Sequence, residues 1–478
     1  MHYRIRTGLM IILMVALARA GAPVAATARP GAPAQLTPTG AVPLPQTYIK
    51  SANPSSYKDY GRTLAISGGT LAIGAPQESG GGIVYVYVRV NGAWVRQGIV
   101  SAANATTGDW FGYDVALEGE TLVVGAPQED SNGSGPTNNS VSNAGAAYVF
   151  VRSNGIWVQQ AFLKPSNIAA DYWFGTAVDI DGDSIVVGAV GDNSTVAGGA
   201  AYVFTRAGGA WSQQGYLKAS NAEQWDRFGG AVGIEGDVVV VGADGERSNG
   251  SGPGNNVAED AGAAYIFERS GGAWSERAYI KPPTVSSYDL FGDAVAIDGG
   301  TVVVGSPHLG PPCCQRDGAA PADPAVLQTG GAFVYVRTSG LLTPTWTLQA
   351  SLYASNADIS DTFGADVDID GDTIVVGASG EDGDGSSPAN NTGDESGAVY
   401  VFRRGGTAWT ELDYRKAFNR DNLDLFGYAV AFSGGTMAVT ALHEAGNGSS
   451  PSDNSASFSG AVYVQDIGRR LSMPNLQR

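Results

Sequence analysis

Four stretches of this 478-residue sequence carry acidic residues at spacings that could bind a cation. Each begins with glutamate and runs through Gly, Ser and Asn or Asp to a proline, at residues 129–136, 246–253, 381–388 and 444–451. Oxygen ligands at alternating positions, with glycines between them, could coordinate Ca²⁺, the one cofactor that the sequence suggests. The candidate metal ligands are Glu129, Asp130, Asn132, Glu381, Asp382 and Asp384. Because Gly, Ser, Asn and Pro also form ordinary turns, a purely structural interpretation stands beside this one.

Aromatic residues gather within three positions before a recurring aromatic–glycine pair. They are Trp110, Tyr172, Trp173, Trp225 and Tyr288. Exposed aromatic rings beside carboxylates suit sugar rings and protein hot spots, so these residues are candidates for a ligand-binding face; the alternative is packing between repeats. Aspartates also stand two residues before the pair, where we expect them to accept backbone N–H bonds in a turn. They are Asp109, Asp226, Asp289, Asp361 and Asp424.

Residues that would support catalysis are scarce. Beyond the first 28 residues, His308 and His443 are the only histidines, and neither lies in a Gly-x-Ser-x-Gly or His-Glu-x-x-His context. No phosphate-binding loop, zinc-ligand spacing or nucleotide fingerprint occurs. A hydrolase that uses a pair of carboxylates stays open, because a sequence does not give the distance between two side chains.

The elements that would position these residues form a sevenfold repeat. Each repeat opens with an aromatic–glycine pair and an alternating strand, continues with an apolar strand ending in Gly-Ala or Gly-Ser, and then a variable loop, a third strand and a tryptophan-led fourth strand. The pairs begin at Tyr60, Phe111, Phe174, Phe228, Phe291, Phe363 and Phe426. Four strands per period with period-2 alternation predict a blade, and therefore an all-β, seven-bladed β-propeller of four-stranded antiparallel blades.

One fourth strand is missing at the C-terminal end of the repeats and is found at the N-terminal end. Only six tryptophans begin fourth strands, where we expect them in the core: Trp94, Trp157, Trp211, Trp274, Trp346 and Trp409. The sequence QTYIK at residues 46–50 matches QAFLK at residues 160–164. We therefore expect residues 46–51 to pair with residues 461–464 and close the ring, which removes an open sheet edge. The predicted propeller covers residues 46–466, followed by a short tail at residues 467–478.

The N-terminal region predicts export. Residues 1–28 combine a basic start, an apolar run and small-residue sites, which is typical of a signal peptide cleaved after Ala20 or Ala28, and residues 29–45 form a Pro/Ala-rich linker. No later segment is apolar enough to span a membrane. A secreted protein, extracellular or periplasmic, is expected.

Charge and cysteine content narrow the partners. The formal net charge of −18 would repel nucleic acid and favours cations and neutral or basic ligands. The only two cysteines, Cys313 and Cys314, are adjacent. Their Cα atoms would lie about 3.8 Å apart, closer than the roughly 4.4–6.8 Å of ordinary disulfides. We interpret them as a loop feature or an intermolecular link rather than a redox pair.

Residues 46–466 resemble the FG-GAP repeat family. The resemblance rests on the recurring Phe-Gly and Gly-Ala-Pro elements, such as Phe111-Gly112 and VVGAP at residues 123–127. Members of this family include the β-propeller of integrin α subunits and secreted bacterial proteins. The resemblance implies calcium in the hairpin between first and second strands. The matching residues are Asp179, Asp181, Asp183, Asp368, Asp370 and Asp372. The last ligand position holds Val187 or Val376, so we interpret these hairpins as turns too short to wrap Ca²⁺.

Repetition without a unique catalytic constellation predicts a non-catalytic, monomeric binding or adhesion module for an extracellular protein or carbohydrate. In an antiparallel blade, the loops between second and third strands emerge at the same face as the connections that precede each aromatic–glycine pair. Length variation concentrates in these loops, which predicts a ligand-binding face there. The alternative is a secreted lectin or glycan-active enzyme that uses the same face.

Overall fold

The structure is a computed structural model that describes residues 46–467 with internal gaps. The gaps are residues 52–53, 79, 134–137, 193–197, 253, 311–327, 339–344, 384–393 and 451–452. The predicted signal peptide, the linker and the tail beyond residue 467 lie outside the described residues, as do Asp384, Cys313 and Cys314.

Two kinds of strand follow from two kinds of sequence pattern. The strand β7 (Thr121–Ala126) is an unbroken apolar run and is buried at every position. The strand β9 (Ile156–Leu163) alternates between exposed and partly buried residues along most of its length. An unbroken run therefore marks an inner strand that is covered on both faces, and alternation marks a strand with one face in solvent.

Within the described residues, 28 strands form seven four-stranded sheets, here called blades 1 to 7. The first strands are β2 (Leu64–Ser67), β6 (Val115–Glu118), β10 (Phe174–Asp181), β14 (Val232–Glu235), β18 (Val295–Asp298), β22 (Phe363–Asp370) and β26 (Phe426–Ser433). The second strands are β3 (Thr70–Ala75), β7, β11 (Ser184–Ala189), β15 (Val238–Ala243), β19 (Thr301–Ser306), β23 (Thr373–Ala378) and β27 (Thr436–Ala441). The third strands are β4 (Ile83–Val90), β8 (Ala146–Ser153), β12 (Ala200–Ala207), β16 (Ala263–Ser270), β20 (Gly331–Thr338), β24 (Ala398–Gly405) and β28 (Ala461–Asp466). The fourth strands are β5 (Ala93–Val100), β9, β13 (Ala210–Leu217), β17 (Ala273–Ile280), β21 (Thr345–Leu352), β25 (Ala408–Arg415) and, for blade 7, β1 (Thr47–Ile49).

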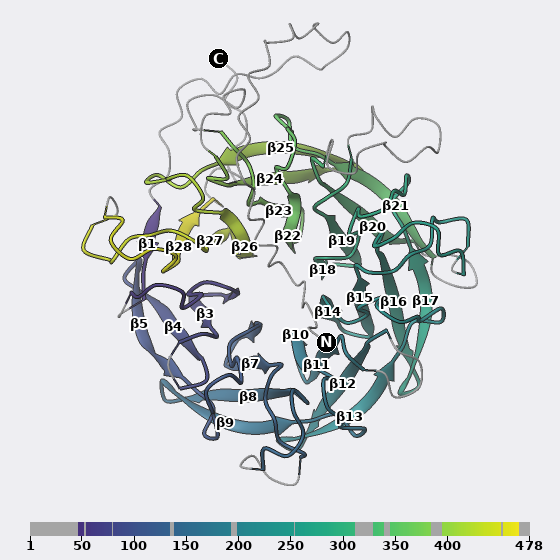
Figure 1. Cartoon of the computed structure of the whole chain (residues 1–478), viewed down its shortest axis with the longest axis horizontal. Coiled ribbons are helices and arrows are strands. Elements are labelled where there is room, and N and C mark those ends of the chain that lie inside the picture. Colours follow the sequence, from purple (N-terminus) through teal and green to yellow (C-terminus); the bar gives the residue numbers. More distant parts are fainter. Residues whose placement is uncertain are drawn as a thin grey trace, which may run out of the picture. The chain divides into compact units, whose positions relative to one another are not determined.

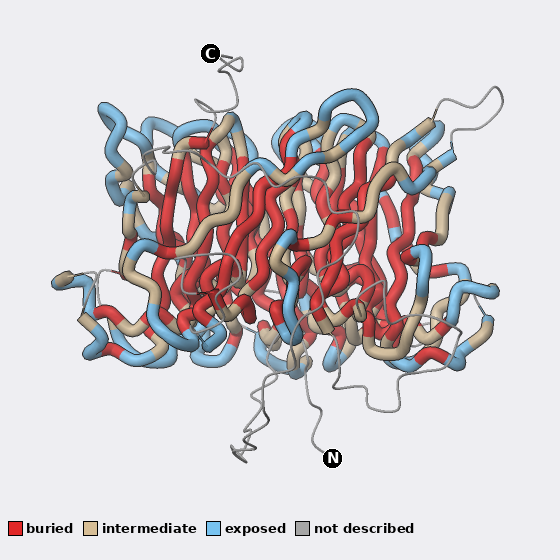
Figure 2. The backbone as a smooth tube through the Cα atoms, turned by 90° about the horizontal axis from the view of Figure 1, so that it is seen from above, coloured by how far each residue is buried: buried red, intermediate tan, exposed pale blue. Residues whose placement is uncertain are grey.

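The blades form a closed ring. The first strand of each blade lies next to the centre and the fourth at the rim (Figure 1), and the first strands of consecutive blades contact one another, including β26 with β2. Seen from the side, buried residues fill the strands and exposed loops lie at both ends (Figure 2). The predicted seven-bladed propeller of antiparallel four-stranded blades is confirmed.

The glycines of the repeat are required where consecutive blades approach each other. A Cβ atom on Gly125, at the end of β7, would lie 2.1 Å from the carbonyl oxygen of Gly175 in the next blade. Gly175 has φ +94°, and its own Cβ would lie 2.2 Å from the carbonyl oxygen of Ala146. The preceding Phe174 is fully buried. The Phe-Gly and Gly-Ala elements are therefore the two sides of one backbone contact between blades.

The tryptophans that begin the fourth strands lie at the rim, which corrects their expected place in the core. They are only partly buried, because the fourth strand is the outer edge of its blade. Trp157 Nε1 donates to Gln97 Oε1 of the preceding blade at 2.9 Å, and the Arg152 guanidinium lies 5.2 Å from the centre of its ring. The same bond to a glutamine of the preceding blade recurs at Trp211, Trp274 and Trp409, so four of these tryptophans link neighbouring blades.

The N-terminal strand closes the ring as predicted. The strand β1 pairs antiparallel with β28, with Tyr48 opposite Tyr463. Gln46 also contacts blade 6: its Nε2 donates to the carbonyl oxygen of Lys416, and its Oε1 accepts from the Phe418 N–H, both at 3.1 Å. Blade 7 therefore joins the two ends of the described chain.

We predict that a chain beginning at residue 52 is less stable than one beginning at Gln46, because β28 would expose an unpaired edge and the contacts of Gln46 and Tyr48 would be lost. Thermal unfolding should show a lower midpoint, and light scattering should detect dimers formed by pairing of the free edges. The chain that begins at Gln46 is the matched control. Equal stability of two monomeric chains would contradict the closure.

Candidate ligand-binding face

One face of the ring is built from two kinds of loop. The interblade connections run from the fourth strand of one blade to the aromatic–glycine pair of the next, and the 2–3 loops join second to third strands. The N–H of Trp173 donates to the Asn143 carbonyl at 3.0 Å, and the N–H of Tyr288 donates to the Glu259 carbonyl at 2.6 Å. Each of these connections thus lies against the 2–3 loop of the blade it leaves, which places both kinds of loop at one face.

The interblade connections share a backbone that is unusual for their residue types. Positions one and three before the aromatic–glycine pair have positive φ, including Trp110 (59°), Trp173 (53°), Trp225 (79°) and Tyr288 (69°). Bulky side chains rarely adopt this conformation, so the surrounding hydrogen bonds must hold it. The backbone of the connection, rather than a strand, therefore sets the direction of these aromatic side chains.

The aspartates two residues before the pair have the predicted turn role. Each accepts a hydrogen bond from the backbone N–H three residues earlier, as Asp226 does from Glu223 at 2.7 Å and Asp361 from Asp358 at 2.6 Å. Burial raises the pKa of Asp226 to about 7 and that of Asp361 to about 8. These carboxylates are part of the connection and not a free ligand set.

The five candidate aromatic residues separate into three positions. Trp225 is 54% exposed, and Tyr288 at the corresponding position donates through its hydroxyl to Glu259 Oε2 at 2.6 Å. Trp110 and Trp173, directly before the pair, are partly buried, and the Nε1 atom of Trp173 is buried with no hydrogen-bond partner among the described residues. Tyr172 is only 3% exposed, which corrects its expected place on an accessible face: it occupies the buried position that holds aspartate in other blades.

An axial cluster that sequence reasoning missed lies beside Trp110. Trp110 stacks on Tyr113 with the planes 4° apart and the ring centres separated by 5.7 Å, and the Arg62 guanidinium lies 4.0 Å from the Tyr113 ring centre. Arg62 Nη1 donates to the Tyr428 hydroxyl at 3.3 Å. Arg62, Tyr113 and Tyr428 each directly follow an aromatic–glycine pair. That shared position, at the start of the innermost strand, was the signal that could have identified them.

An arginine–aspartate ion pair, Arg227–Asp244, lies near a further aspartate, Asp293. Arg227 forms two bonds to Asp244, of 2.9 and 2.6 Å. Asp293, which also follows an aromatic–glycine pair, has its pKa raised to about 7 by burial and by the nearby Asp244. The centre of this face therefore combines aromatic rings, two arginines and carboxylates.

The aspartates of the predicted degenerate calcium hairpins link consecutive blades. Asp179 accepts from the Ile234 N–H and Asp368 from the Phe432 N–H, at 2.8 and 2.6 Å, and the other oxygen of each accepts from the following N–H. Two residues further along each hairpin, Asp181 accepts from the Gly236 N–H and Asp370 from the Gly434 N–H, both at 2.6 Å. Asp183 and Asp372 form ion pairs with Arg206 and Arg404, each at 2.6 Å. Burial raises the pKa of Asp179 and Asp368 to about 7.

The glutamates predicted as calcium ligands in the 2–3 loops form ion pairs. Glu129 Oε2 lies 2.7 Å from Lys164 Nζ, and Glu381 pairs with Lys416. Their neighbours also have other roles, since Asp130 Oδ1 accepts from the Asn143 N–H and Asp382 Oδ1 from the Glu395 N–H, both at 2.8 Å. Asn132 donates its N–H to the Asn138 carbonyl at 3.3 Å, and Asp384 lies outside the described residues.

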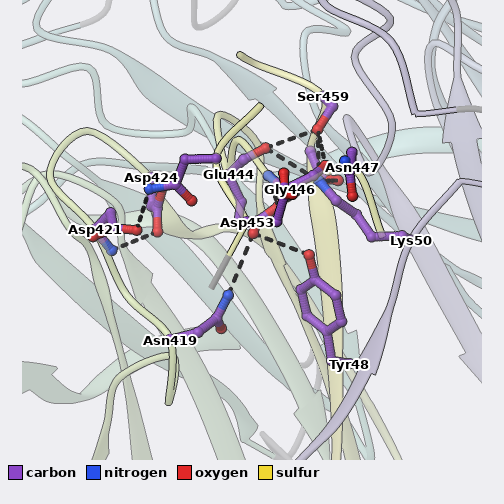
Figure 3. Close-up of polar contacts among 12 residues, drawn as sticks. Tyr48, Lys50, Asn419, Asp421, Asp424, Glu444, Gly446, Asn447, Asp453 and Ser459 are labelled. Carbon is purple, nitrogen blue, oxygen red and sulfur yellow. Dashed lines mark hydrogen bonds and ion pairs between the residues drawn. The ribbon is translucent and has the colours of Figure 1, made fainter. Parts of the chain in front are cut away.

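Blade 7 shows the same arrangement in full (Figure 3). Lys50 pairs with Glu444, and its Nζ also donates to Ser459 Oγ at 2.6 Å and to the Gly460 carbonyl at 2.7 Å. Glu444 Oε1 accepts from the Tyr48 hydroxyl at 3.0 Å and from Asn419 Nδ2 at 3.3 Å. Burial lowers the pKa of Lys50. A buried carboxylate, neutralised by a lysine from the fourth strand, thus anchors the 2–3 loop.

These features define a seven-bladed propeller with an aromatic, partly acidic loop face. A family model of the FG-GAP repeat matches residues 94–150, 157–204, 211–267, 274–335 and 346–402. The chain therefore belongs to the FG-GAP repeat family, which confirms the resemblance. It is also 28% identical to mouse (Mus musculus) integrin alpha-M over 164 residues, an alignment that covers 31% of this chain and 12% of that protein.

We predict that Lys281→Ala lowers the free energy of unfolding by about 3–5 kcal/mol, because the Glu246 carboxylate, which is 1% exposed, loses its counter-charge. The double variant Glu246→Leu, Lys281→Tyr reproduces the residues of blade 5, Leu309 and Tyr353, and should recover most of the loss. Denaturant unfolding midpoints measure both. A loss below about 1 kcal/mol in the single variant would show that this ion pair is not a structural anchor.

We predict that the protein is more stable at pH 6 than at pH 8. Burial raises the pKa values of Asp179 and Asp368 to about 7 and of Asp366 to about 8, from 3.8 in the unfolded chain. The folded state therefore binds more protons over this range, so stability is lost as the pH rises through 7 to 8. Thermal unfolding should show the decline, and Asp366→Asn should flatten it. A midpoint that rises between pH 6 and pH 8 would contradict this.

Proposed function

We propose that this chain is a secreted, non-catalytic binding or adhesion module that presents its ligand face on the interblade connections and 2–3 loops. The observation that carries the proposal is Trp225, the only tryptophan among the exposed large hydrophobic residues described, 54% exposed in a connection of that face. A large ring held outward by a left-handed backbone adds little to the core. It suits a contact with a partner.

The surroundings of Trp225 form a patch around the 2–3 loop of blade 4, made of Trp225, Val257 and Tyr288. Val257 is 70% exposed. On one side the loop contacts the connection that carries Trp225, through the bond of Asn256 Nδ2 to Glu223 Oε2 at 2.5 Å. On the other side it contacts Tyr288 through Glu259. We call these residues the blade 4 patch.

The charge of the patch supports a neutral or basic ligand. Glu223 and Glu259 flank its apolar residues, and the whole chain carries a formal net charge of −18. A carboxylate beside an aromatic ring suits a cationic side chain of a protein, which can lie over the ring. An extracellular protein with a basic segment is the partner class that we propose.

Carbohydrate binding is the second candidate, as a lectin or a glycan-active enzyme. An exposed indole lies with amide and carboxylate groups around one loop. This combination favours a sugar, which stacks its apolar face on an aromatic ring and forms hydrogen bonds to such polar groups through its hydroxyls. We favour the non-catalytic form. The ring of His443 packs edge-on against Phe458 at 4.7 Å, and burial lowers its pKa to about 4, so this histidine is neutral at pH 7.

Export of the chain is part of the proposal and rests on residues 1–28. The similarity to an integrin α chain supports an extracellular place and a binding role. None of the described residues belongs to a helix that could cross a bilayer.

We predict that Trp225→Ala weakens binding about tenfold or more on a glycan array and on a panel of extracellular proteins with basic segments, because removal of a central aromatic contact costs about 2 kcal/mol. The unfolding midpoint should stay within about 1 °C of the parent, since the ring is exposed. Ile156→Ala, a similarly exposed residue at the start of β9, is the matched control and should bind normally.

Two further results would decide between sites and functions. If Trp110→Ala abolishes binding and Trp225→Ala does not, the axial cluster is the ligand site and the blade 4 patch is not. Turnover of any arrayed glycan would disprove the non-catalytic assignment.

A further inference from the structure

A lysine ammonium group occupies the same position in five of the seven blades. The lysine directly follows the fourth strand, and its acidic partner stands three residues after the second strand. The pairs are Lys50–Glu444, Lys164–Glu129, Lys218–Asp192, Lys281–Glu246 and Lys416–Glu381. In each pair the acidic side chain is at most 2% exposed and the lysine at most 15%.

The ammonium group is bound by oxygens of the acid and of the 2–3 loop, which we call the ammonium site. In four of the five blades, Nζ donates to the carbonyl oxygen of the glycine that precedes the third strand, and Lys416 donates instead to the Glu381 carbonyl at 3.2 Å. The distance is 2.7 Å for Lys164 to Gly145, 2.7 Å for Lys218 to Gly199 and 2.6 Å for Lys281 to Gly262. A carboxylate and a carbonyl at hydrogen-bonding distance suit a group with several N–H donors.

Blade 5 lacks both charges together. Leu309 stands at the acidic position and Tyr353 at the lysine position, and both pack in one hydrophobic cluster. Leu309 is 1% exposed. A buried apolar pair thus replaces a buried ion pair, so no charge is left without its counterpart.

Blade 1 keeps the acid and lacks the lysine. Glu78 stands three residues after β3, whereas Ser101 follows β5. The backbone of the site is formed as elsewhere, because the Gly82 N–H donates to the Glu78 carbonyl at 3.1 Å, as the Gly145 N–H does to the Glu129 carbonyl at 2.8 Å. A serine side chain is too short to bring a donor to this position, and it carries no charge.

The Glu78 side chain is partly exposed, whereas the acids of the five lysine pairs are buried. Its Oε2 atom is buried and has no hydrogen-bond partner among the described residues. The charge of Lys58 partly offsets the rise that burial causes in the pKa of Glu78, and its Nζ donates to the carbonyl oxygen of Gln77 at 3.4 Å. Ser101 is exposed, so the end of the site from which lysine enters in other blades opens to solvent.

We propose that the ammonium site of blade 1 binds an ammonium group supplied from outside the chain, either the free ion or the primary amine of a ligand. The site offers the Glu78 carboxylate and the carbonyl oxygens of Glu78 and Gly82, at positions where the other blades bind lysine Nζ. One carboxylate and two carbonyls are too few for Ca²⁺, which takes about six to eight oxygens. The site therefore suits a singly charged group, and its two carbonyl oxygens suit N–H donors.

The test uses the full chain and n-butylammonium, which reproduces the missing lysine side chain. At pH 8, we expect saturating n-butylammonium to raise the unfolding midpoint by about 2–3 °C in a one-to-one manner. Ammonium chloride should act in the same direction, and the ratio of the two affinities distinguishes a free ion from an alkylamine as the preferred source. Tetramethylammonium, which has no N–H, should have no effect, and an equal response to it would overturn the proposal.

Variants test whether the response arises at the blade 1 site. Ser101→Lys supplies the ammonium group within the chain, so it should raise the midpoint and abolish the response to n-butylammonium, and Glu78→Gln should abolish the response as well. Lys164→Ala creates the same opening in blade 2 and is the positive control. If Lys164→Ala responds and the parent does not, the proposal is wrong. A response that appears only in Lys58→Ala would show that Lys58 fills the site and would equally overturn it.

Discussion

The inner edge of each blade must find hydrogen-bond partners across the gap to its neighbour, and the rest of the ring depends on this constraint. The first strand pairs with the second on one side only, so alternate N–H groups on its other side face the preceding blade. Carboxylates on that blade accept them: Asp366 accepts from Val430, Asp368 from Phe432 and Asp370 from Gly434. These bonds give hydrogen-bond partners to N–H groups of an otherwise unpaired strand edge, and they fix the register of one blade against the next.

Further from the axis, five of the interblade connections use an asparagine to contact the blade that they enter. Asn104 lies in the connection between blades 1 and 2; its Nδ2 donates to Glu129 at 3.3 Å, and its Oδ1 accepts from the Tyr148 hydroxyl at 3.0 Å. The same asparagine–tyrosine bond recurs in four more blades, through Asn167, Asn221, Asn356 and Asn419. The acid and the lysine belong to one blade and the asparagine to the connection that precedes it, so the complete cluster forms only when that connection packs against the blade. A buried site of this kind contributes more to the choice of one packing arrangement between connection and blade than to the free energy of unfolding.

The loop face built from the interblade connections and 2–3 loops is held by similar internal hydrogen bonds. Most of its acidic groups already accept hydrogen bonds inside the connections and 2–3 loops, which leaves few side chains uncommitted. What distinguishes one blade from the next is the residue carried at the positive-φ positions, from Trp225 and Tyr288 to Ser360 and Leu423. A repeated scaffold with variable residues at fixed positions can acquire a ligand site without any change in its core.

The sequence by itself determined the blade count, the strand order and the N-terminal closure, because these depend on local periodicity and on counting repeated elements. The turn role of Asp226 and its counterparts was also local and predictable. Tertiary structure alone decided the partners of residues far apart in the chain. Asp179 and Asp368 bond to the next blade, about 55 to 64 residues away. Glu129 and Glu381 pair with Lys164 and Lys416, for which the sequence predicted no role, and Tyr172 is buried although we expected it on an accessible face. Such contacts depend on how the blades approach each other, and spacing along one chain does not encode that distance.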